Sequence, residues 1–338
     1  MPIKNAINCR LPRLFLWLIT LLLIGCANKM ATVRTPDKEM TMNPQSALAT
    51  THCFGRYLIE VPTNFKFAQS YAHRAGDIDF IPHSNQRSFE ELIEQRVAHF
   101  KAKPLNREGK SWYVDTLVYA PNKKIIRYYN RGPNPYITEL DGYVLAGKAM
   151  YKFNSGTSTS KLESGTKWVA DTLVRVRERA PGEIPTEPGF CIDGGFIKGN
   201  ENVYESVTIG MAPADQPAVR INFNTSTPNA IAPGLLARED KVNGFFSSFT
   251  KLRRGKRIIN GIDGEESLLR TTNNQGDDIH LFTWESSHGS ADNRRPAIQI
   301  ELSAGGPTNK MASPYSDQEA TKLWDSITST VRLRPGAF

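Results

Sequence analysis

The chain has few cysteines and no apolar run long enough to cross a bilayer as a helix. Only four cysteines occur in 338 residues, which excludes a small scaffold held together by many disulfides. The apolar run near the N-terminus covers 11 residues, Leu14 to Ile24, whereas a membrane-spanning helix needs about 20. No later segment comes closer, and we therefore expect no transmembrane helix.

Catalytic and metal-binding motifs are also absent from the sequence. There is no Gly-x-Ser-x-Gly elbow to expose a nucleophile and no His-Glu-x-x-His helix to bind zinc. The six histidines include no pair spaced four residues apart, and no cysteine pair completes a zinc site. The segment 286–292 contains serine, histidine and aspartate, but neighbours on one loop rarely adopt triad geometry. We therefore predict a protein that is not an enzyme and has no catalytic residue, metal or cofactor.

Positive charge is modest and dispersed. The formal net charge is +8, and it falls to +5 without the three basic residues of the first 25 positions. Lysine and arginine are not gathered in a stripe, and aromatic residues do not alternate with them as they do on a surface that binds single strands. Nucleic acid is therefore not an expected partner.

The N-terminus has the pattern of a bacterial lipoprotein signal. A cationic region and the apolar run precede Leu23-Ile24-Gly25-Cys26. This pattern resembles the lipobox, in which a small residue admits the signal peptidase and the thiol receives a diacylglycerol. We predict that residues 1–25 are a signal peptide and that Cys26 carries a lipid anchor, palmitate included. The alternative is an ordinary signal peptide with a chance cysteine.

The predicted anchor also indicates a location. Two or three acyl chains hold a protein at a membrane far more firmly than one chain does. Ala27 follows the cysteine at the position where an acidic residue often means retention in the inner membrane. We therefore expect a lipoprotein in the outer membrane that faces the periplasm.

Two segments separate the rest of the chain into parts. Residues 26–51 are polar and show no sustained period, so we predict a flexible tether. Three prolines lie between Ala180 and Gly189 and exclude a helix or a central strand there. We place the domain boundary at this segment and expect an exposed linker between an N-terminal domain, residues 52–180, and a C-terminal domain, residues 189–338.

Two cysteines remain for the folded body. Cys9 leaves with the signal peptide and Cys26 is lipidated, so only Cys53 and Cys191 reach an oxidising compartment. They either form a disulfide or lie apart as buried thiols that behave as small apolar residues. The sequence leaves both possibilities open.

The two predicted domains resemble each other. Cys53 and Cys191 each lead a strand, and near each domain's end a tryptophan, Trp168 or Trp324, precedes a short run that alternates apolar residues with arginine. This weak repeat of about 140 residues indicates duplicated domains rather than a solenoid. Both tryptophans lie on apolar faces of predicted helices, so we expect both in the core. Gly194, Gly195 and Gly199 match no phosphate-binding loop and are expected to form a bulge or turn.

Alternating apolar and polar residues predict mainly strands. The clearest are 112–119, 125–129, 203–209, 219–223, 279–284 and 298–302. Two capping boxes predict helices, one from Ser88 with Glu91 and one from Ser316 with Glu319. The predicted fold class is α+β, with two related tandem domains that each consist of a mainly antiparallel sheet packed with about two helices.

Several segments carry a resemblance to a known family. They are residues 252–266, 282–285 and 296–302 in the second half, and residues 53–62 with the helix at Ser88 in the first. Together they resemble the C-terminal and N-terminal domains of the immunity proteins, group four, that neutralise type VI secretion lipase effectors. Their order and spacing cover nearly the whole mature chain.

The resemblance implies a partner and a mode of action. It implies a periplasm-facing protein that binds an incoming phospholipase effector between two domains and keeps its active site from opening onto lipid, as in interbacterial competition. A lipid anchor would hold such an inhibitor beside the membrane under attack. The other reading is a structural or cell-wall-associated envelope lipoprotein without an effector partner.

The resemblance supplies no contact residues, so candidates come from loop composition. Aromatic and arginine side chains dominate the binding energy of protein interfaces, and two connections are rich in them: 129–136 and 285–295. The candidate effector-binding residues are Tyr129, Arg131, Tyr136, His288, Arg294 and Arg295.

Overall fold

The computed structural model describes residues 48–74, 76–105, 111–129, 137–227, 233–241, 249–287, 292–306 and 311–338. These residues belong to one compact unit, Ser46–Phe338. Within the described part, no helix is long and apolar enough to span a membrane. The signal peptide, Cys26 and nearly all of the predicted tether lie outside the described residues.

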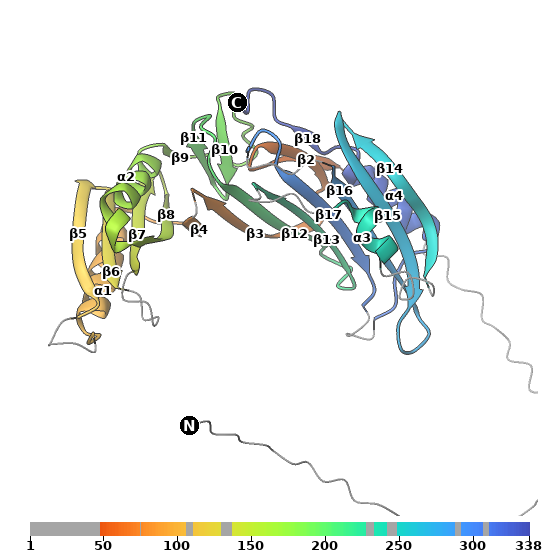
Figure 1. Cartoon of the computed structure of the whole chain (residues 1–338), viewed down its shortest axis with the longest axis horizontal. Helices are drawn as coiled ribbons and strands as arrows, with labels where there is room; N and C mark the ends of the chain where they lie inside the picture. Colours follow the sequence, from red (N-terminus) through yellow and green to blue (C-terminus); the bar gives the residue numbers. More distant parts are fainter. Residues whose placement is uncertain are drawn as a thin grey trace, which may run out of the picture. The chain divides into compact units, whose positions relative to one another are not determined.

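Strands dominate both halves of the chain (Figure 1). The N-terminal half contains β1 (Ala49–Phe54), β2 (Tyr57–Pro62), β3 (Phe65–His73), β4 (Gly76–Ile81), α1 (Gln86–Lys101), β5 (Tyr113–Ala120), β6 (Lys123–Tyr129), β7 (Ile137–Ala146), β8 (Ala149–Ser158), a 3₁₀ turn (Thr159–Lys161), α2 (Leu162–Leu173) and β9 (Val176–Glu178). The C-terminal half contains β10 (Gly189–Ile192), β11 (Gly195–Lys198), β12 (Glu205–Pro213), β13 (Val219–Ser226), α3 (Leu235–Lys241), β14 (Thr250–Ile259), β15 (Ile262–Thr272), β16 (Asp278–Ser286), β17 (Ala297–Ala304), α4 (Asp317–Thr328) and β18 (Arg332–Leu333). The α+β class and the two helices expected in each half are confirmed.

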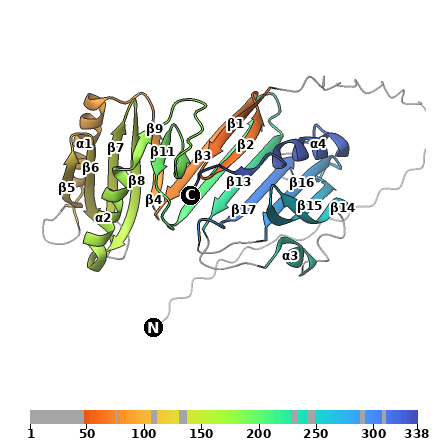
Figure 2. The same ribbon diagram turned by 90° about the horizontal axis from the view of Figure 1, so that it is seen from above.

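Twelve of the described strands form one antiparallel sheet that runs through both halves (Figure 2). Its order is β14-β15-β16-β17-β13-β12-β3-β4-β8-β7-β6-β5. Read outward from the central β3–β12 pair, the N-terminal strands run 3-4-8-7-6-5 and the C-terminal strands run 12-13-17-16-15-14. The two series match strand for strand, so the structure contains the internal repeat as a repeated topology.

Two small sheets complete the fold, and each combines strands from both halves. The β1–β2 hairpin pairs with β18, and the β10–β11 hairpin pairs with β9. Each hairpin therefore joins the closing strand of the other half of the chain. Gly194, in the β10–β11 turn, has a φ of +57°, a conformation that glycine adopts without steric cost.

A disulfide joins the two hairpins. Cys53 of β1 and Cys191 of β10 are bonded, with an S–S distance of 2.06 Å. Beside it, Gly55 and Cys191 exchange two backbone hydrogen bonds, with N···O distances of 2.9 and 2.8 Å. Both cysteines lie two residues before the turn of their hairpin, so the bond links equivalent positions of the repeat.

The helices cover the sheet on opposite faces. Gly142 of β7 lies against Val169 and Leu173 of α2, whereas the adjacent Tyr143 packs in a cluster with Phe89 of α1. Because successive residues of a strand point to opposite faces, α1 and α2 lie on different sides. In the C-terminal half the same logic separates α3 from α4, since Glu265 accepts a bond from the Leu236 amide and Glu266 from the Trp324 indole.

The capping predictions have different outcomes. Helix α4 begins after Ser316, whose side chain accepts from the Glu319 amide as predicted. Helix α1 begins three residues earlier than predicted, because Asn85 is its N-cap and Ser88 supplies the reciprocal bond. Asparagine caps a helix as well as serine does, and here the earlier of two overlapping capping patterns determines the start.

The expectation that both tryptophans lie in the core is half wrong. Trp324 is fully buried, but Trp168 is 58% exposed. The alternating run starts six residues after Trp168 and seven after Trp324, and one residue rotates a helical position by about 100°. The two tryptophans are therefore not equivalent positions of the repeat, and Val169 takes the buried place in α2.

Arginine side chains hold the proline-rich linker against the body of the protein. Buried Arg334 donates to the carbonyl oxygens of Pro185, Glu187 and Gly189, and burial lowers its pKa to about 10. Arg177 pairs with the carboxylates of Glu183 and Glu187. The segment is thus fixed along its length, which the sequence expectation of an exposed linker did not include. The exact domain limits stay a prediction.

Candidate functional site

One face of the large sheet is accessible over its central strands. In β12 the side chains alternate between buried residues and the accessible Ser206, Thr208 and Gly210. The same alternation in β13 and β17 leaves polar residues on one side. We call this side the open face; its members include Ser70, Asp77, Asp79, Asn154, Thr208, Asn222, Asn224, Thr283, Gln299 and Glu301.

Strand register shows that the open face is continuous across both halves. Thr208 is paired with Ser70 in β3 and with Asn224 in β13, and paired residues share a face. Further pairs lead to Glu265 beside α3 at one end, and to Asp141 beside α1 at the other. The face therefore extends between these two helices. Six strands spaced about 4.8 Å apart make it about 24 Å wide between β4 and β16.

In the C-terminal half, side chains on the open face form a hydrogen-bonded row. Asn224 donates to Gln299 at 3.5 Å, and Gln299 donates to Glu285 at 3.2 Å. Both carboxylate oxygens of Glu285 also accept from one guanidinium nitrogen of Arg238 in α3, each at 2.7 Å. Because each side chain is fixed by its neighbour, this part of the face presents amide groups in defined positions, ready to bond a polar partner.

In the N-terminal half, the open face is built around the buried carboxylate of Asp141. It accepts from Arg96 of α1 at 2.9 Å, from Asn154 at 2.8 Å and from the hydroxyl of Tyr143 at 3.1 Å. Burial, reinforced by this carboxylate, raises the pKa of Tyr143, so the phenol stays neutral and donates. Lys152 reaches outward to Asp79 at 3.4 Å. The cluster fixes α1 to the sheet at the edge of the open face.

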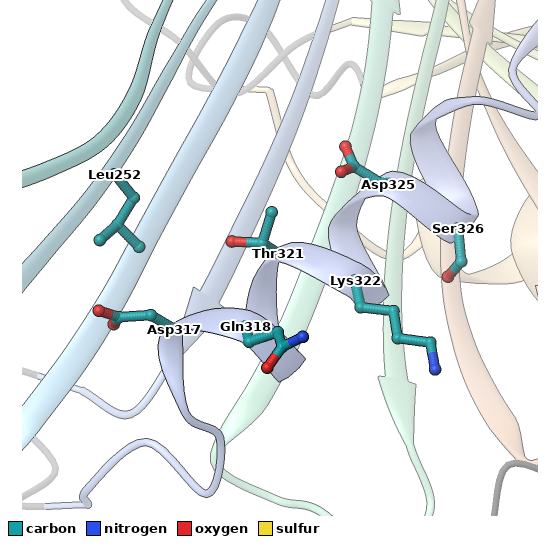
Figure 3. A pocket seen from close by; sticks show the side chains of 7 residues that line it. All are labelled: Leu252, Asp317, Gln318, Thr321, Lys322, Asp325 and Ser326. Atoms are coloured by element: carbon teal, nitrogen blue, oxygen red, sulfur yellow. The ribbon is translucent and has the colours of Figure 1, made fainter.

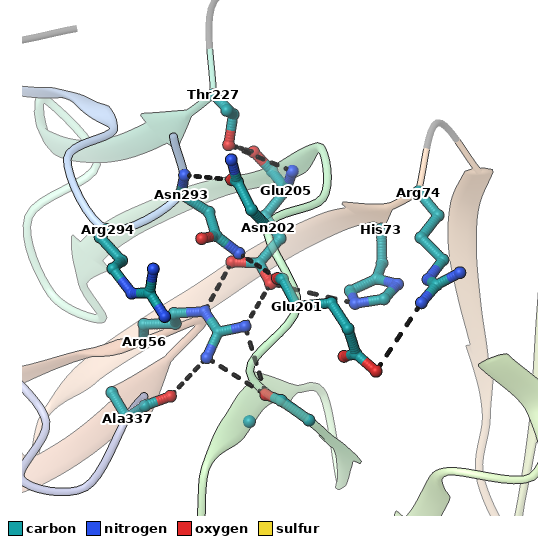
Figure 4. A network of polar contacts seen from close by, with 12 residues as sticks. Arg56, His73, Arg74, Glu201, Asn202, Glu205, Thr227, Asn293, Arg294 and Ala337 are labelled. Atoms are coloured by element: carbon teal, nitrogen blue, oxygen red, sulfur yellow. Dashed lines mark hydrogen bonds and ion pairs between the residues drawn. The ribbon is translucent and has the colours of Figure 1, made fainter. Parts of the chain in front are cut away.

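A second polar network lies at the junction of the halves (Figure 4). Arg56, in the β1–β2 turn, makes a bidentate pair with buried Glu205 at 2.7 and 2.8 Å, and also donates to the carbonyl of Ala337. Its guanidinium lies 4.3 Å above the ring of Phe338. Removing one partner of such a pair would leave a buried charge uncompensated, so the network fixes the hairpin and the chain end together.

His73 is a buried member of this junction with an unpaired ring nitrogen. Its Nε2 is 3.9 Å from a Glu205 oxygen, and its Nδ1 has no hydrogen-bond partner. Burial, followed by the charges of Arg74 and Arg56, lowers its pKa to about 3. The ring is neutral at physiological pH, and its role is packing against Phe190, 5.8 Å away between ring centroids.

An open groove of about 810 Å³ lies between β14 and α4 (Figure 3). Its lining residues are Leu252, Asp317, Gln318, Thr321, Lys322, Asp325 and Ser326. The two carboxylates are already used, since Asp325 pairs with Arg253 and Asp317 with His280. Among the described residues that line it, none pairs a nucleophile with a free base.

The structure does assemble a serine, a histidine and an aspartate, although not where the sequence has them adjacent. Nδ1 of His280 lies 2.8 Å from Ser313 Oγ, and Nε2 lies 2.9 Å from Asp317. His280 is 1% exposed, and Ser313 Oγ also accepts the Tyr315 amide. The trio links β16 to the start of α4.

The residues predicted from loop composition are distributed over both halves. Tyr129 ends β6 and is half-buried, and its amide donates to the Trp112 carbonyl. Arg294 lies at the junction, 5.6 Å from the Phe338 ring, and Arg295 donates to the Asp292 carbonyl. Arg131, Tyr136 and His288 lie outside the described residues. Effector contact by these six residues therefore stays a prediction.

The open face itself was not predicted. Its signal was present in the sequence, because serine, threonine, asparagine and glutamine occupy most of the alternate positions of the strands at 206–210, 222–226 and 299–303, with Gly210 and Glu301 at the others. Alternation by itself indicates a strand with one accessible side and does not mark that side as a binding surface.

Comparison with family models identifies the class of protein as immunity proteins. Residues 50–176 match the model described as Tle cognate immunity protein 4 N-terminal domain, and residues 183–336 match the corresponding C-terminal domain. The chain belongs to the Tle cognate immunity protein 4 family, as the sequence resemblance indicated. No curated protein matches the chain.

Solved structures show the same fold. The apo immunity protein TplEi of the type VI secretion system from Pseudomonas aeruginosa aligns with a TM-score of 0.77 and 24% identity, over 85% of this chain and 97% of that one. A chain in the crystal structure of a Tle4-Tli4 complex aligns with a TM-score of 0.78 and 24% identity, over 85% and 98%. TplEi complexed with an "L" peptide aligns with a TM-score of 0.72.

Proposed function

We propose that this protein is a lipid-anchored, periplasm-facing immunity protein that binds a type VI secretion phospholipase effector and prevents it from hydrolysing membrane lipid. The observation that carries the proposal is membership of the immunity family over both halves of the chain. The relatives include a Tle4-Tli4 complex and a peptide-bound TplEi. The protein acts by binding alone and has no hydrolytic activity of its own.

The open face is the proposed contact surface. It spans both halves between α1 and α3, its polar side chains are accessible, and those of the C-terminal half are fixed by their neighbours. Inhibition of this kind needs an interface of about 2,000 Å² or more in total. The candidate residues of the segments 129–136 and 285–295 are proposed to supply further aromatic and arginine anchors to this interface.

The anchor belongs to the same proposal. The lipobox-like run ending at Cys26 would place the inhibitor on the outer membrane, facing the periplasm, beside the lipid that the effector attacks. Replacing Cys26 with Ser should remove labelled palmitate from the protein and shift it out of the membrane fraction. Palmitate still incorporated in this variant would contradict the anchor and leave the binding function untouched.

A survival assay tests the function. Cells that direct the cognate lipase to the periplasm should survive with the intact protein and die without it. Equal death in both would remove the immunity function and favour a structural envelope lipoprotein. Purified protein should also bind the purified lipase at about a one-to-one ratio, and neither wild-type protein nor Ser313→Ala should release fatty acid from phospholipid vesicles.

A matched pair of variants tests the surface. Thr208→Arg places a large charge at the centre of the open face, and Gln318→Arg makes the same change on exposed α4, in the groove. Thr208→Arg should weaken lipase binding at least about 10-fold, as expected when a hot region is blocked, while Gln318→Arg binds as wild type. The reverse result would move the contact surface to the groove.

A further inference from the structure

The exchange of hairpins between the halves is reciprocal. β18, the last strand of the C-terminal half, pairs with β2, and β9, the last strand of the N-terminal half, pairs with β11. The two hairpins occupy equivalent positions of the repeat, and so do the two closing strands. The pattern is that of two subunits that swap an identical element, here contained in one chain.

The β1–β2 hairpin packs on the sheet of the C-terminal half. Tyr57 of β2 contacts Phe223 of β13, with ring centroids 6.2 Å apart. The Glu60 amide donates to Thr330, just beyond α4, at 2.9 Å. Arg56 holds Glu205 of β12. The first hairpin of the chain therefore covers strands and a helix that follow it by more than a hundred residues.

The β10–β11 hairpin packs on the sheet of the N-terminal half. A Cβ added at Gly194 would lie 2.7 Å from the ring of Phe80 in β4, and one added at Gly195 would lie 2.7 Å from the hydroxyl of Tyr151 in β8. Phe190 meets Tyr71 edge to face at 6.2 Å. Glycine in the turn and at the first position of β11 thus permits close approach to the other half.

We infer that each half is incomplete alone, and that its missing core element is the hairpin of the other half. Removing β1–β2 would uncover mainly the C-terminal half, together with Phe67 of β3, and removing β10–β11 would uncover the N-terminal half. The β1–β2 hairpin fits the surface on the C-terminal half, and the β10–β11 hairpin fits the surface on the N-terminal half. The arginine-held linker and the Cys53–Cys191 disulfide secure an assembly that side-chain packing already specifies.

Two substitutions in the full-length protein test the inference. Tyr57→Ala shortens a side chain in the first hairpin, and Gly195→Ala inserts a methyl group against Tyr151 from the second. Amide hydrogen exchange is followed by mass spectrometry in each half. Tyr57→Ala should speed exchange roughly 10-fold or more in β13, β17 and α4, and Gly195→Ala should do so in β4, β8 and α2.

The crossed pattern decides the outcome. If each half carried its own core, Tyr57→Ala would speed exchange mainly in β3 to β8, and Gly195→Ala mainly in β12 to β17. That uncrossed result would overturn the inference. The experiment uses no lipase, so a failed immunity assay has no bearing on it.

A second measurement does not depend on either substitution being tolerated. A protease site inserted at exposed Gly182, which has nothing within 4 Å of an added Cβ, allows the folded protein to be cut between the halves. After cutting and reduction of the disulfide, the two fragments should still elute together at the size of the intact protein. Two separate, folded fragments would contradict the inference.

Discussion

The two halves share one strand order but cover the same face of the sheet by different means. In the N-terminal half, α1 packs Phe89, Ile93 and Phe100 into an apolar cluster on that face. In the C-terminal half, the short α3 is held mainly by charges, with Arg238 on Glu285 and Arg254 on Glu239. Duplicated topology therefore fixes where elements lie, while the residues at each position decide whether a face becomes core or stays available to a partner.

The largest expected difference between the halves is at the two tryptophans. Trp324→Ala removes a buried ring that packs on Phe282 and donates to Glu266 at 2.7 Å, and should lower the free energy of unfolding by about 3–5 kcal/mol. Trp168→Ala, at an exposed site, should lower it by less than about 1 kcal/mol. Urea denaturation measures both, and equal losses would contradict the assigned burial.

The disulfide tests how far the halves hold together without a covalent link. It joins residues 138 apart in sequence, and the double variant Cys53→Ser, Cys191→Ser should lose about 2–4 kcal/mol of unfolding free energy. Because the hairpins remain packed, the variant should keep the far-ultraviolet circular dichroism of the wild type. Adding a reductant to wild-type protein should reproduce the loss, and a reductant effect on the double variant would point to another cause.

The helix caps give a smaller comparison between the halves. Asn85→Ala at α1 and Ser316→Ala at α4 each remove a side chain that accepts from the third residue of the helix. Each should cost about 1 kcal/mol of unfolding free energy. Ser88→Ala removes only the reciprocal bond and should cost less than Asn85→Ala. A larger loss for Ser88→Ala than for Asn85→Ala would indicate that Ser88 is the N-cap of α1, as the sequence predicts.

An effect of similar size is expected from a pH dependence at the junction. The folded-state pKa of His73 is about 3, below the usual 6.5, so the unfolded chain binds a proton first as the pH falls. Between pH 7 and 5.5 this should reduce stability by about 1 kcal/mol. His73→Gln should lack this part of the pH dependence, while Glu205, whose pKa burial raises, stays in both proteins. Identical pH profiles would contradict a buried neutral histidine.

Local sequence patterns predicted individual strands and helices better than they predicted which strands and helices pack together. Alternation gave the strands at 219–223 and 298–302, and a capping box gave the start of α4. The exchange of hairpins could not be predicted, because alternation shows that a strand has a buried face but not which sheet covers it. The predicted burial of Trp168 was wrong for a related reason. A shift of one residue along a helix turns a side chain by about 100°, which is enough to move it from the core to solvent.

The candidate surface was missed because its residues are ordinary. Asn224, Gln299 and Thr208 carry no motif, and they form a surface only when β12, β13 and β17 are adjacent. No single segment of the sequence indicates the strand order that makes these residues neighbours. Residue composition instead favoured two loops with tyrosine and arginine as the binding site. Contact of these loops with the effector is a separate prediction.

The contact between Arg56 and Ala337 spans 281 positions of the chain. The first hairpin cannot complete these contacts until β18 and Ala337 have been synthesised, and contacts between such distant segments slow the folding of β-rich proteins. Without β18, the edge of β2 would lack its backbone partner, and an unpaired strand edge favours aggregation. Pairing of β18 with β2 is therefore a late step in folding, because it brings together segments that are synthesised far apart in time.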